Sequence, residues 1–319
     1  MPETVPGTLP TSTDHERRGV IAGLLAYGWW GFFPLYFKAI RAVPLGEVVA
    51  HRYVWSLVVL AAILALRGDL RATPRLLRDG RLAATLLLSA FLLSFNWLFF
   101  IYAVGANLVL QASLGYFMNP LVNVLLGCLF LKERLSARQW VSIALAGVGV
   151  SVLTVLTGSL PWISLILAFS FGSYGLVRKV ASVGPLRGHA IETAMLAPFA
   201  LAYLLWLGWH GRAAFPGPSM QVNLLLPVIG LASVMPLLCF VYAARRLRYS
   251  TIGFLQYITP TMQFLLAVAV FGETFGVARL TGFAFIWAGL ALYSWETWSQ
   301  ARARRTESLR APSAPSENA

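Results

Sequence analysis

Residues 82–103 read LAATLLLSAFLLSFNWLFFIYA, a run of 22 residues without a charged side chain. A helix needs roughly 20 apolar residues to cross a hydrocarbon layer of about 30 Å, so this run predicts a transmembrane helix. In the whole chain 58% of residues are hydrophobic and only 12% are charged. A soluble domain carries about twice that charged fraction. We therefore predict an all-α polytopic membrane protein.

Nine further apolar stretches are long enough to span a membrane, which makes ten predicted spans in all. Short connections between them predict that consecutive helices are antiparallel neighbours. The polar segments 1–19 and 299–319 are expected to be disordered cytoplasmic tails. The other nine spans are 20–40, 45–66, 109–131, 138–157, 161–180, 187–209, 223–244, 251–271 and 277–298.

The distribution of Lys and Arg orients these spans, because cytoplasmic loops retain positive charge. With the N-terminus inside, 20 of the 25 Lys and Arg residues lie on the inner side, four lie on the outer side, and Arg52 lies within a span. Both termini are therefore expected in the cytoplasm. The net charge of +13 follows from topology and does not indicate a nucleic-acid partner.

The second half of the chain repeats features of the first half. A shift of 140 residues places Pro120 on Pro260, and it also places Glu133 on Glu273. Because each copy contains five spans, an odd number, the second copy must be inverted in the membrane. The predicted domains are two five-helix repeats, 20–157 and 161–298. Inverted repeats are typical of secondary transporters, whose substrate sites lie near the midplane.

Several motifs resemble the EamA-type permeases of the drug/metabolite transporter superfamily, and within them the RarD group. The resemblance covers residues 17 to 298, both copies. The most diagnostic stretches are GWWG at 28–31, EVVAHRYVWS at 47–56, FNW at 95–97, QASLGYFMNP at 111–120, QYITP at 256–260 and FGE at 271–273.

This resemblance implies a ten-helix permease of the bacterial inner (plasma) membrane with two EamA repeats. Some relatives export amino acids or drugs, and RarD proteins are commonly labelled chloramphenicol-sensitive, which describes a phenotype more than a substrate. We therefore predict a secondary-active exporter of small metabolites or drugs. Proton coupling and facilitated diffusion, in either direction, both remain open.

Three ionisable side chains stand out within the predicted spans: His51, Arg52 and Glu192. A charge inside hydrocarbon costs roughly 2.5 to 3.5 kcal/mol at the helix centre and by default indicates function. At 1.5 Å per residue, Arg52 and Glu192 lie on the order of 14 Å apart along the membrane normal. No direct ion pair between them is expected.

We interpret Arg52 as the ligand of an anionic or carbonyl group of the substrate, and Glu192 as the proton-coupling residue. In the structural alternative, each instead anchors neighbouring helices by hydrogen bonds. For His51 the structural alternative is favoured, because Glu47 lies one helical turn before it.

Uncharged polar and aromatic side chains at membrane depth are candidates to line a substrate pocket. The alternatives are helix association for the amides and core packing for the aromatic rings. The candidates are Trp30, Asn96, Tyr102, Tyr116, Asn119, Tyr242, Gln256 and Tyr257. Pro120 and Pro260 lie about nine residues into their predicted helices, where proline kinks a helix, and are candidate hinges for alternating access.

Other function classes lack their motifs. The chain has no G-x-x-x-x-G-K-[ST] loop, and its aspartates Asp14, Asp69 and Asp79 all lie outside the spans. Cys128 and Cys239 lie in apolar runs without metal-site spacing. We therefore predict no enzyme activity, catalytic residue, cofactor or metal. A non-transport sensor is the remaining alternative. The expected partners are a small-molecule substrate, the lipid bilayer and protons, with the protein a monomer or a homodimer.

Overall fold

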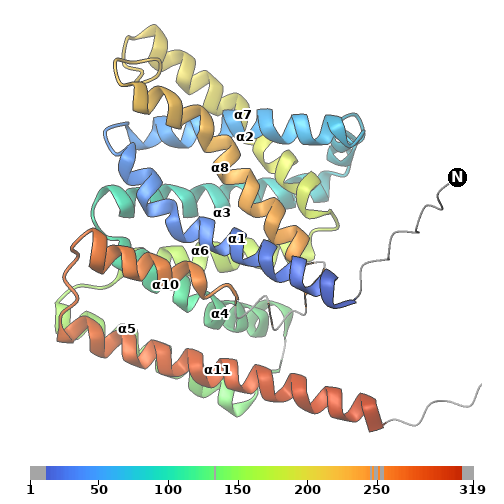
Figure 1. Cartoon of the computed structure of the whole chain (residues 1–319), viewed down its shortest axis with the longest axis vertical. Helices are drawn as coiled ribbons and strands as arrows, with labels where there is room; N and C mark the ends of the chain where they lie inside the picture. Colours follow the sequence, from blue (N-terminus) through green and yellow to red (C-terminus); the bar gives the residue numbers. More distant parts are fainter. Residues whose placement is uncertain (1–11, 133, 245, 248–250, 252–254, 311–319) are drawn as a thin grey trace, which may run out of the picture. The chain divides into compact units, whose positions relative to one another are not determined.

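The computed structural model of the chain describes residues 12–132, 134–244, 246–247, 251 and 255–310. Every regular element in this part of the chain is helical (Figure 1), which confirms the all-α polytopic architecture. The elements are α1 (Ser12–Ala39), α2 (Leu45–Leu66), the 3₁₀ helix η1 (Thr73–Arg78), α3 (Gly80–Gly105), α4 (Val109–Leu131), α5 (Ala137–Thr157), α6 (Trp162–Val180), α7 (Pro185–Trp209), α8 (Met220–Ala244), α10 (Ile258–Leu265), the π-helix η2 (Leu266–Val270) and α11 (Val277–Arg310).

Within the described residues, nine helices are long and apolar enough to cross a membrane: α1 to α8 and α11. Each coincides with a predicted span over its apolar part. The end helices extend further than the sequence suggested, because α1 begins at Ser12 and α11 ends at Arg310. Parts of both polar tails are therefore helical, since an amphipathic or polar turn can continue a helix beyond the hydrocarbon.

The ninth predicted span, 251–271, differs from the others. Its described apolar helix is the shorter segment Ile258–Val270, formed by α10 and η2. Pro260 therefore lies in the first turn of α10 and not nine residues into a helix, as the sequence suggested. A proline is tolerated there because the first turn needs no N–H donor for an intrahelical bond. Residues 252–254 lie outside the described part of the chain.

Two carboxylates accept hydrogen bonds from backbone N–H groups that lie between helices or at the start of a helix. Glu47 is fully buried, and its Oε1 accepts hydrogen bonds from the N–H groups of Ala214 at 2.7 Å and Phe215 at 3.1 Å. The partly buried Glu273 accepts from the N–H groups of Val109 at 2.7 Å and Leu110 at 2.9 Å, at the start of α4. These N–H groups have no helical partner, so each carboxylate satisfies donors that would otherwise be orphaned. Glu133, the expected counterpart of Glu273, lies outside the described residues.

The chain divides into two compact units. Unit 1 comprises Met1–Asn119 and Trp162–Thr274, and unit 2 comprises Pro120–Pro161 and Phe275–Ala319. The division cuts α4 between Asn119 and Pro120, and each unit takes helices from both predicted repeats. The organisation into two inverted repeats stays a prediction.

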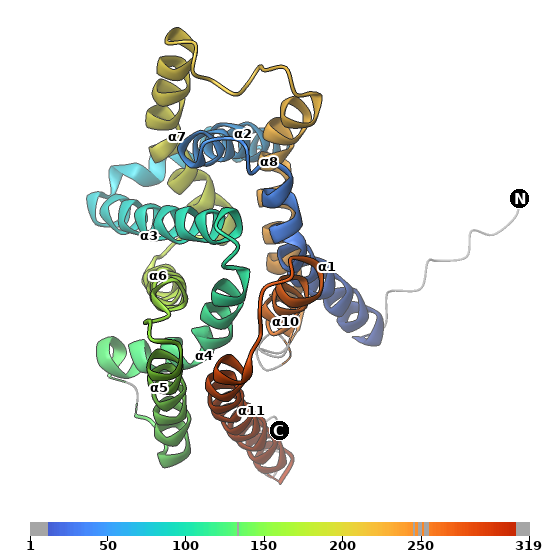
Figure 2. The ribbon, with the colours of Figure 1, turned by 90° about the vertical axis from the view of Figure 1, so that its left-hand side faces the viewer.

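Unit 1 is built on the packing of α2 against α7 and α8, with α1 against α8 and α10, and α3 against α6 and α7 (Figure 2). Small apolar clusters fill these contacts, for example Leu60 and Leu64 of α2 with Ala190 of α7 and Val234 of α8. At Gly230 of α8 a side chain would collide with the backbone of Trp55 in α2. Glycine therefore permits the close crossing of α2 and α8.

Unit 2 rests on the packing of α5 against α11. Gly149 of α5 faces Gly282 and Ile286 of α11, where an added Cβ would lie 2.7 Å from the Gly282 carbonyl oxygen. An ion pair of 2.8 Å between Arg138 and Glu296 joins the same two helices. Small residues let helix backbones approach closely, which is a main source of helix association in lipid.

We expect Gly149→Ala to lower the free energy of unfolding by about 1–3 kcal/mol, because overpacking displaces α11. The measurement is thermal or denaturant unfolding of the purified protein in detergent. Gly147→Ala on the same helix is the matched control, since no atom lies within 4 Å of its added Cβ. Equal stability of the two variants would contradict this account of α5–α11 packing.

Candidate functional site

Arg52 is buried in unit 1, with 3% of its surface exposed. Its guanidinium lies over the ring of Trp97 at 4.2 Å from the centroid and over that of Tyr53 at 5.2 Å. Its Nε has no hydrogen-bond partner among the described residues. Aromatic faces attract a desolvated cation by about 2 kcal/mol, but they do not satisfy this Nε–H group. A planar guanidinium in this state can still donate to an anionic or carbonyl oxygen.

Glu192 on α7 is the second buried charge, with 1% of its surface exposed. Ser89 of α3 donates a hydrogen bond of 2.6 Å to Oε1. Arg178 of α6 forms an ion pair at 3.5 Å, and His189 Nδ1 lies 3.4 Å from Oε2. The carboxylate therefore joins three helices. Within the described part of the chain, Arg178 and not Arg52 is the arginine at ion-pair distance.

Electrostatic interactions extend this group further. The charge of Glu192 acts on Arg52, and Tyr174 of α6 interacts with Arg52, Arg178 and Glu192. Arg178 is thus in contact with the carboxylate, whereas Arg52 acts on it only through space.

Arg178, His189 and Ser89 were not identified as site residues from the sequence. Arg178 lies at the end of span six and was counted with the loop cations. His189 lies three residues before Glu192, a spacing that places both on one helix face and was the available signal. A Cβ at Gly188 would overlap the Arg178 guanidinium, so this glycine makes room for the arginine.

Asn96, a predicted substrate ligand, is buried and bound within unit 1. Its Nδ2 donates to the Leu167 carbonyl at 3.1 Å and to Ser170 Oγ at 3.0 Å, and its Oδ1 accepts from Tyr116 at 3.2 Å. The amide links α3, α4 and α6. This geometry favours the helix-association alternative for Asn96. The Tyr116 ring packs against Phe100 and Phe171, at 5.8 and 6.2 Å between centroids, which favours the core-packing alternative for Tyr116.

The remaining predicted ligands are dispersed. Trp30 packs against Tyr27 at 5.6 Å between ring centroids. Tyr242 is 37% exposed and contacts the Arg246 guanidinium. Gln256 and Tyr257 form the turn before α10. Asn119 is buried, and its Oδ1 has no hydrogen-bond partner among the described residues.

The contacts of His51 favour the structural alternative for this residue. Its Nδ1 accepts from Trp55 Nε1 at 3.2 Å, so in the neutral ring the proton lies on Nε2. This nitrogen is 3.8 Å from Oε1 of Glu47, the expected partner. The His51 ring also packs against Phe215, at 5.1 Å between centroids. The group fastens the α7–α8 connection to α2.

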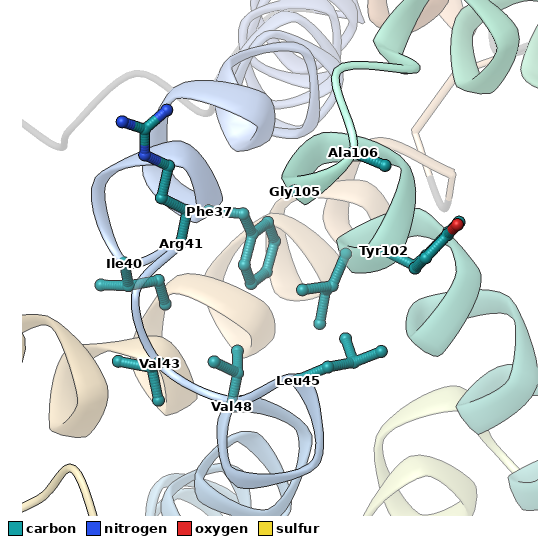
Figure 3. A pocket seen from close by; sticks show the side chains of 10 residues that line it. Phe37, Ile40, Arg41, Val43, Leu45, Val48, Tyr102, Gly105 and Ala106 are labelled. Carbon is teal, nitrogen blue, oxygen red and sulfur yellow. The ribbon is translucent and has the colours of Figure 1, made fainter.

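A pocket of about 350 Å³ lies at the α1–α2 turn and the end of α3. Its lining is mainly apolar, and Tyr102 belongs to it. Figure 3 shows Phe37 and Val48 facing the pocket while the Arg41 guanidinium points away from it. Arg52 and Glu192 are not among the lining residues, so this pocket lacks the buried charges described above.

The described residues contain no cluster of three metal-ligating side chains. Cys128 and Cys239 are free thiols of intermediate burial.

Within the described ranges, nine helices long and apolar enough to cross a membrane, together with buried charged side chains, are typical of a polytopic membrane protein. Residues 17–155 match the EamA-like transporter family. Protein RarD of Salmonella typhi is 47% identical over 277 residues, covering 87% of this chain and 94% of that protein. An uncharacterized transporter of Vibrio cholerae is 45% identical, covering 87% and 92%.

A more distant relative, the chloramphenicol-sensitive protein RarD of Pseudomonas aeruginosa, is 35% identical and covers 88% of this chain and 94% of that protein. One crystal structure has a TM-score of 0.56 at 20% identity, covering 86% of this chain and 96% of that chain, which shows a shared fold. The chain belongs to the EamA-like transporter family, in its RarD group.

We expect Asn96→Ala to lower the free energy of unfolding by about 1–2 kcal/mol, because it removes the hydrogen bonds that join α3 to Tyr116 on α4 and to Leu167 and Ser170 on α6. Unfolding of the purified protein measures this loss. Gln221→Ala, which removes an exposed 3.4 Å contact with the Ala39 carbonyl, should change stability by less than about 0.5 kcal/mol. An unchanged Asn96→Ala protein would contradict the cross-linking role.

Proposed function

We propose that this protein is a secondary-active exporter of small metabolites or drugs, driven by protons, in the bacterial inner membrane with both termini in the cytoplasm. The observation that carries the proposal is the pair of buried charges in unit 1, Arg52 and Glu192, in a member of a transporter family. Ionisable groups inside transmembrane helices commonly mark substrate paths and proton relays. The inner-side excess of Lys and Arg supports the orientation.

Arg52 is the proposed substrate ligand. Its charge is compensated by aromatic faces and by the more distant Glu192, and its Nε–H, which has no partner among the described residues, remains available to an oxygen of the substrate. Trp97 and Tyr53 hold the guanidinium plane in place, which limits the ordering needed on binding. An anionic or carbonyl group is the chemistry that suits this donor.

Glu192 is the proposed proton-coupling residue. It is a carboxylate buried at a position within a transmembrane helix, which is the kind of group that proton relays use. Pro120, where α4 passes from unit 1 to unit 2, is the proposed hinge. Pro260 is a weaker hinge candidate than the sequence suggested, because it lies in the first turn of α10.

A second candidate is a facilitative carrier without proton coupling. The ion pair with Arg178 and the hydrogen bond from Ser89 favour it, since they give Glu192 a structural role that joins α7 to α6 and α3. The two functions differ in their response to the proton gradient.

Chloramphenicol, the compound after which the chloramphenicol-sensitive relative of Pseudomonas aeruginosa is named, is the first substrate to test. We expect cells that express the protein to accumulate less of it than empty-vector cells, and a proton uncoupler to abolish the difference. Arg52→Ala should match empty vector. Glu192→Gln should no longer respond to the uncoupler. Unchanged accumulation with inserted, folded protein would remove this drug as a substrate, whereas uncoupler-insensitive export by the wild type would favour the facilitative carrier.

Arg52→Lys retains the charge but loses the planar fork of donors. We expect it to raise the KM for transported substrate by about tenfold or more, since one bidentate interaction is replaced by a point charge. Arg41→Lys, at the α1–α2 turn, is the matched control and should transport like the wild type. If Arg52→Lys also transports like the wild type, recognition by the guanidinium plane is wrong.

A further inference from the structure

The contacts of Glu192 are unequal in strength. The short hydrogen bond of 2.6 Å comes from Ser89, whereas the Arg178 guanidinium stands at 3.5 Å. Arg178 Nη1 is buried, and no hydrogen-bond partner for it occurs among the described residues. The arginine is therefore paired with the carboxylate through charge alone. Such a pair depends on the carboxylate being ionised.

The backbone of α7 leaves space for the Arg178 guanidinium. A side chain at residue 188 would overlap both terminal nitrogens of Arg178, so Gly188 leaves the surface of α7 open to it. The guanidinium lies against α7 within a turn of Glu192. The contact between α6 and α7 at this end thus includes a glycine, an arginine and a carboxylate.

We propose that Arg178 is the internal counter-ion of the proton site, and that the guanidinium and a proton compete for the Glu192 carboxylate. This inference rests on the proposed function, which assigns the proton to Glu192. In the ionised state the carboxylate attracts Arg178 and holds the last turn of α6 at the start of α7. A protonated, neutral carboxyl group loses that attraction and releases the guanidinium. Proton binding is thereby converted into a change in the contact between two helices.

Charged and titratable groups on the elements around α7 act on the same carboxylate. Arg52 on α2 interacts through space, as does Tyr174 on α6, while His189 on α7 is in contact. The neighbouring Arg187 is engaged with Asp69, and the η1 cations Arg75 and Arg78 are exposed. Ser89 supplies the contact from α3.

The test is an infrared titration of the full-length protein in lipid, with protons as the only ligand. The C=O band of a protonated carboxyl group that disappears in Glu192→Gln belongs to Glu192. We expect Arg178→Gln to move the midpoint of this band to higher pH by about one unit or more, because loss of an adjacent positive charge favours the neutral carboxyl. Arg178→Lys, which keeps the charge, should stay closer to the wild type.

Two further variants make the result specific. Arg187→Gln removes a cation from the same end of α7 and should leave the midpoint within a few tenths of a unit, since its partner is Asp69. Gly188→Ala keeps every charge but displaces the guanidinium, so it should move the midpoint in the same direction as Arg178→Gln. Gly188→Ala therefore tests the proposal even if Arg178→Gln fails to fold.

An unshifted midpoint in Arg178→Gln or, if that variant fails to fold, in Gly188→Ala would overturn the proposal. Equal shifts in Arg178→Gln and Arg187→Gln would do the same, as would a Glu192 band that never titrates. These outcomes are independent of transport. A titrating Glu192 in a protein that moves no substrate would contradict the proposed exporter while leaving the role of Arg178 intact. Export by a protein in which Arg178→Gln leaves the midpoint of the Glu192 band unchanged would contradict the role of Arg178 and leave the proposed exporter intact.

Discussion

Hydrocarbon offers no hydrogen bonds, and this constraint determines how unit 1 is assembled. Helices satisfy most backbone groups internally, and side chains serve the positions that helices leave open. Glu47 accepts a hydrogen bond from an N–H group in the α7–α8 connection, and Glu273 accepts one from an N–H group at the start of α4. Hydroxyl groups bind carbonyl oxygens across helices, as Thr259 does to Tyr27 and Ser113 does to Pro260. The polar side chains of the interior are therefore largely structural.

The same constraint separates the charges that remain. Glu47 is occupied by backbone donors and Glu192 by Arg178 and Ser89. Arg52 differs, because aromatic rings rather than a carboxylate surround its guanidinium. A cation that is stabilised by aromatic rings can still donate hydrogen bonds. In a tight ion pair, the carboxylate would accept these hydrogen bonds instead. This difference is why Arg52 is the proposed ligand and Glu192 the proposed proton acceptor.

Hydropathy predicts the spans well, since membrane thickness sets a length that a sequence must meet with apolar residues. It describes 251–271 least completely, because the described apolar helix there is the shorter segment Ile258–Val270 and residues 252–254 lie outside the described part of the chain. The site was less predictable. The position of a residue within a predicted span identifies Arg52 and Glu192. It does not show whether a cation at the end of a span, such as Arg178, turns toward the interior. The amide partners of Asn96 lie on other helices, so no local pattern could show that it cross-links them.

The carboxylate of Glu47 recognises backbone and not side chains. Every amino acid except proline presents the N–H group that it binds at positions 214 and 215. The side chain at position 214 can therefore vary in relatives that have Glu47. Phe215 is restricted in addition, because its ring packs on His51. A loop fastened in this way can diversify its outer surface without loosening its attachment to the bundle.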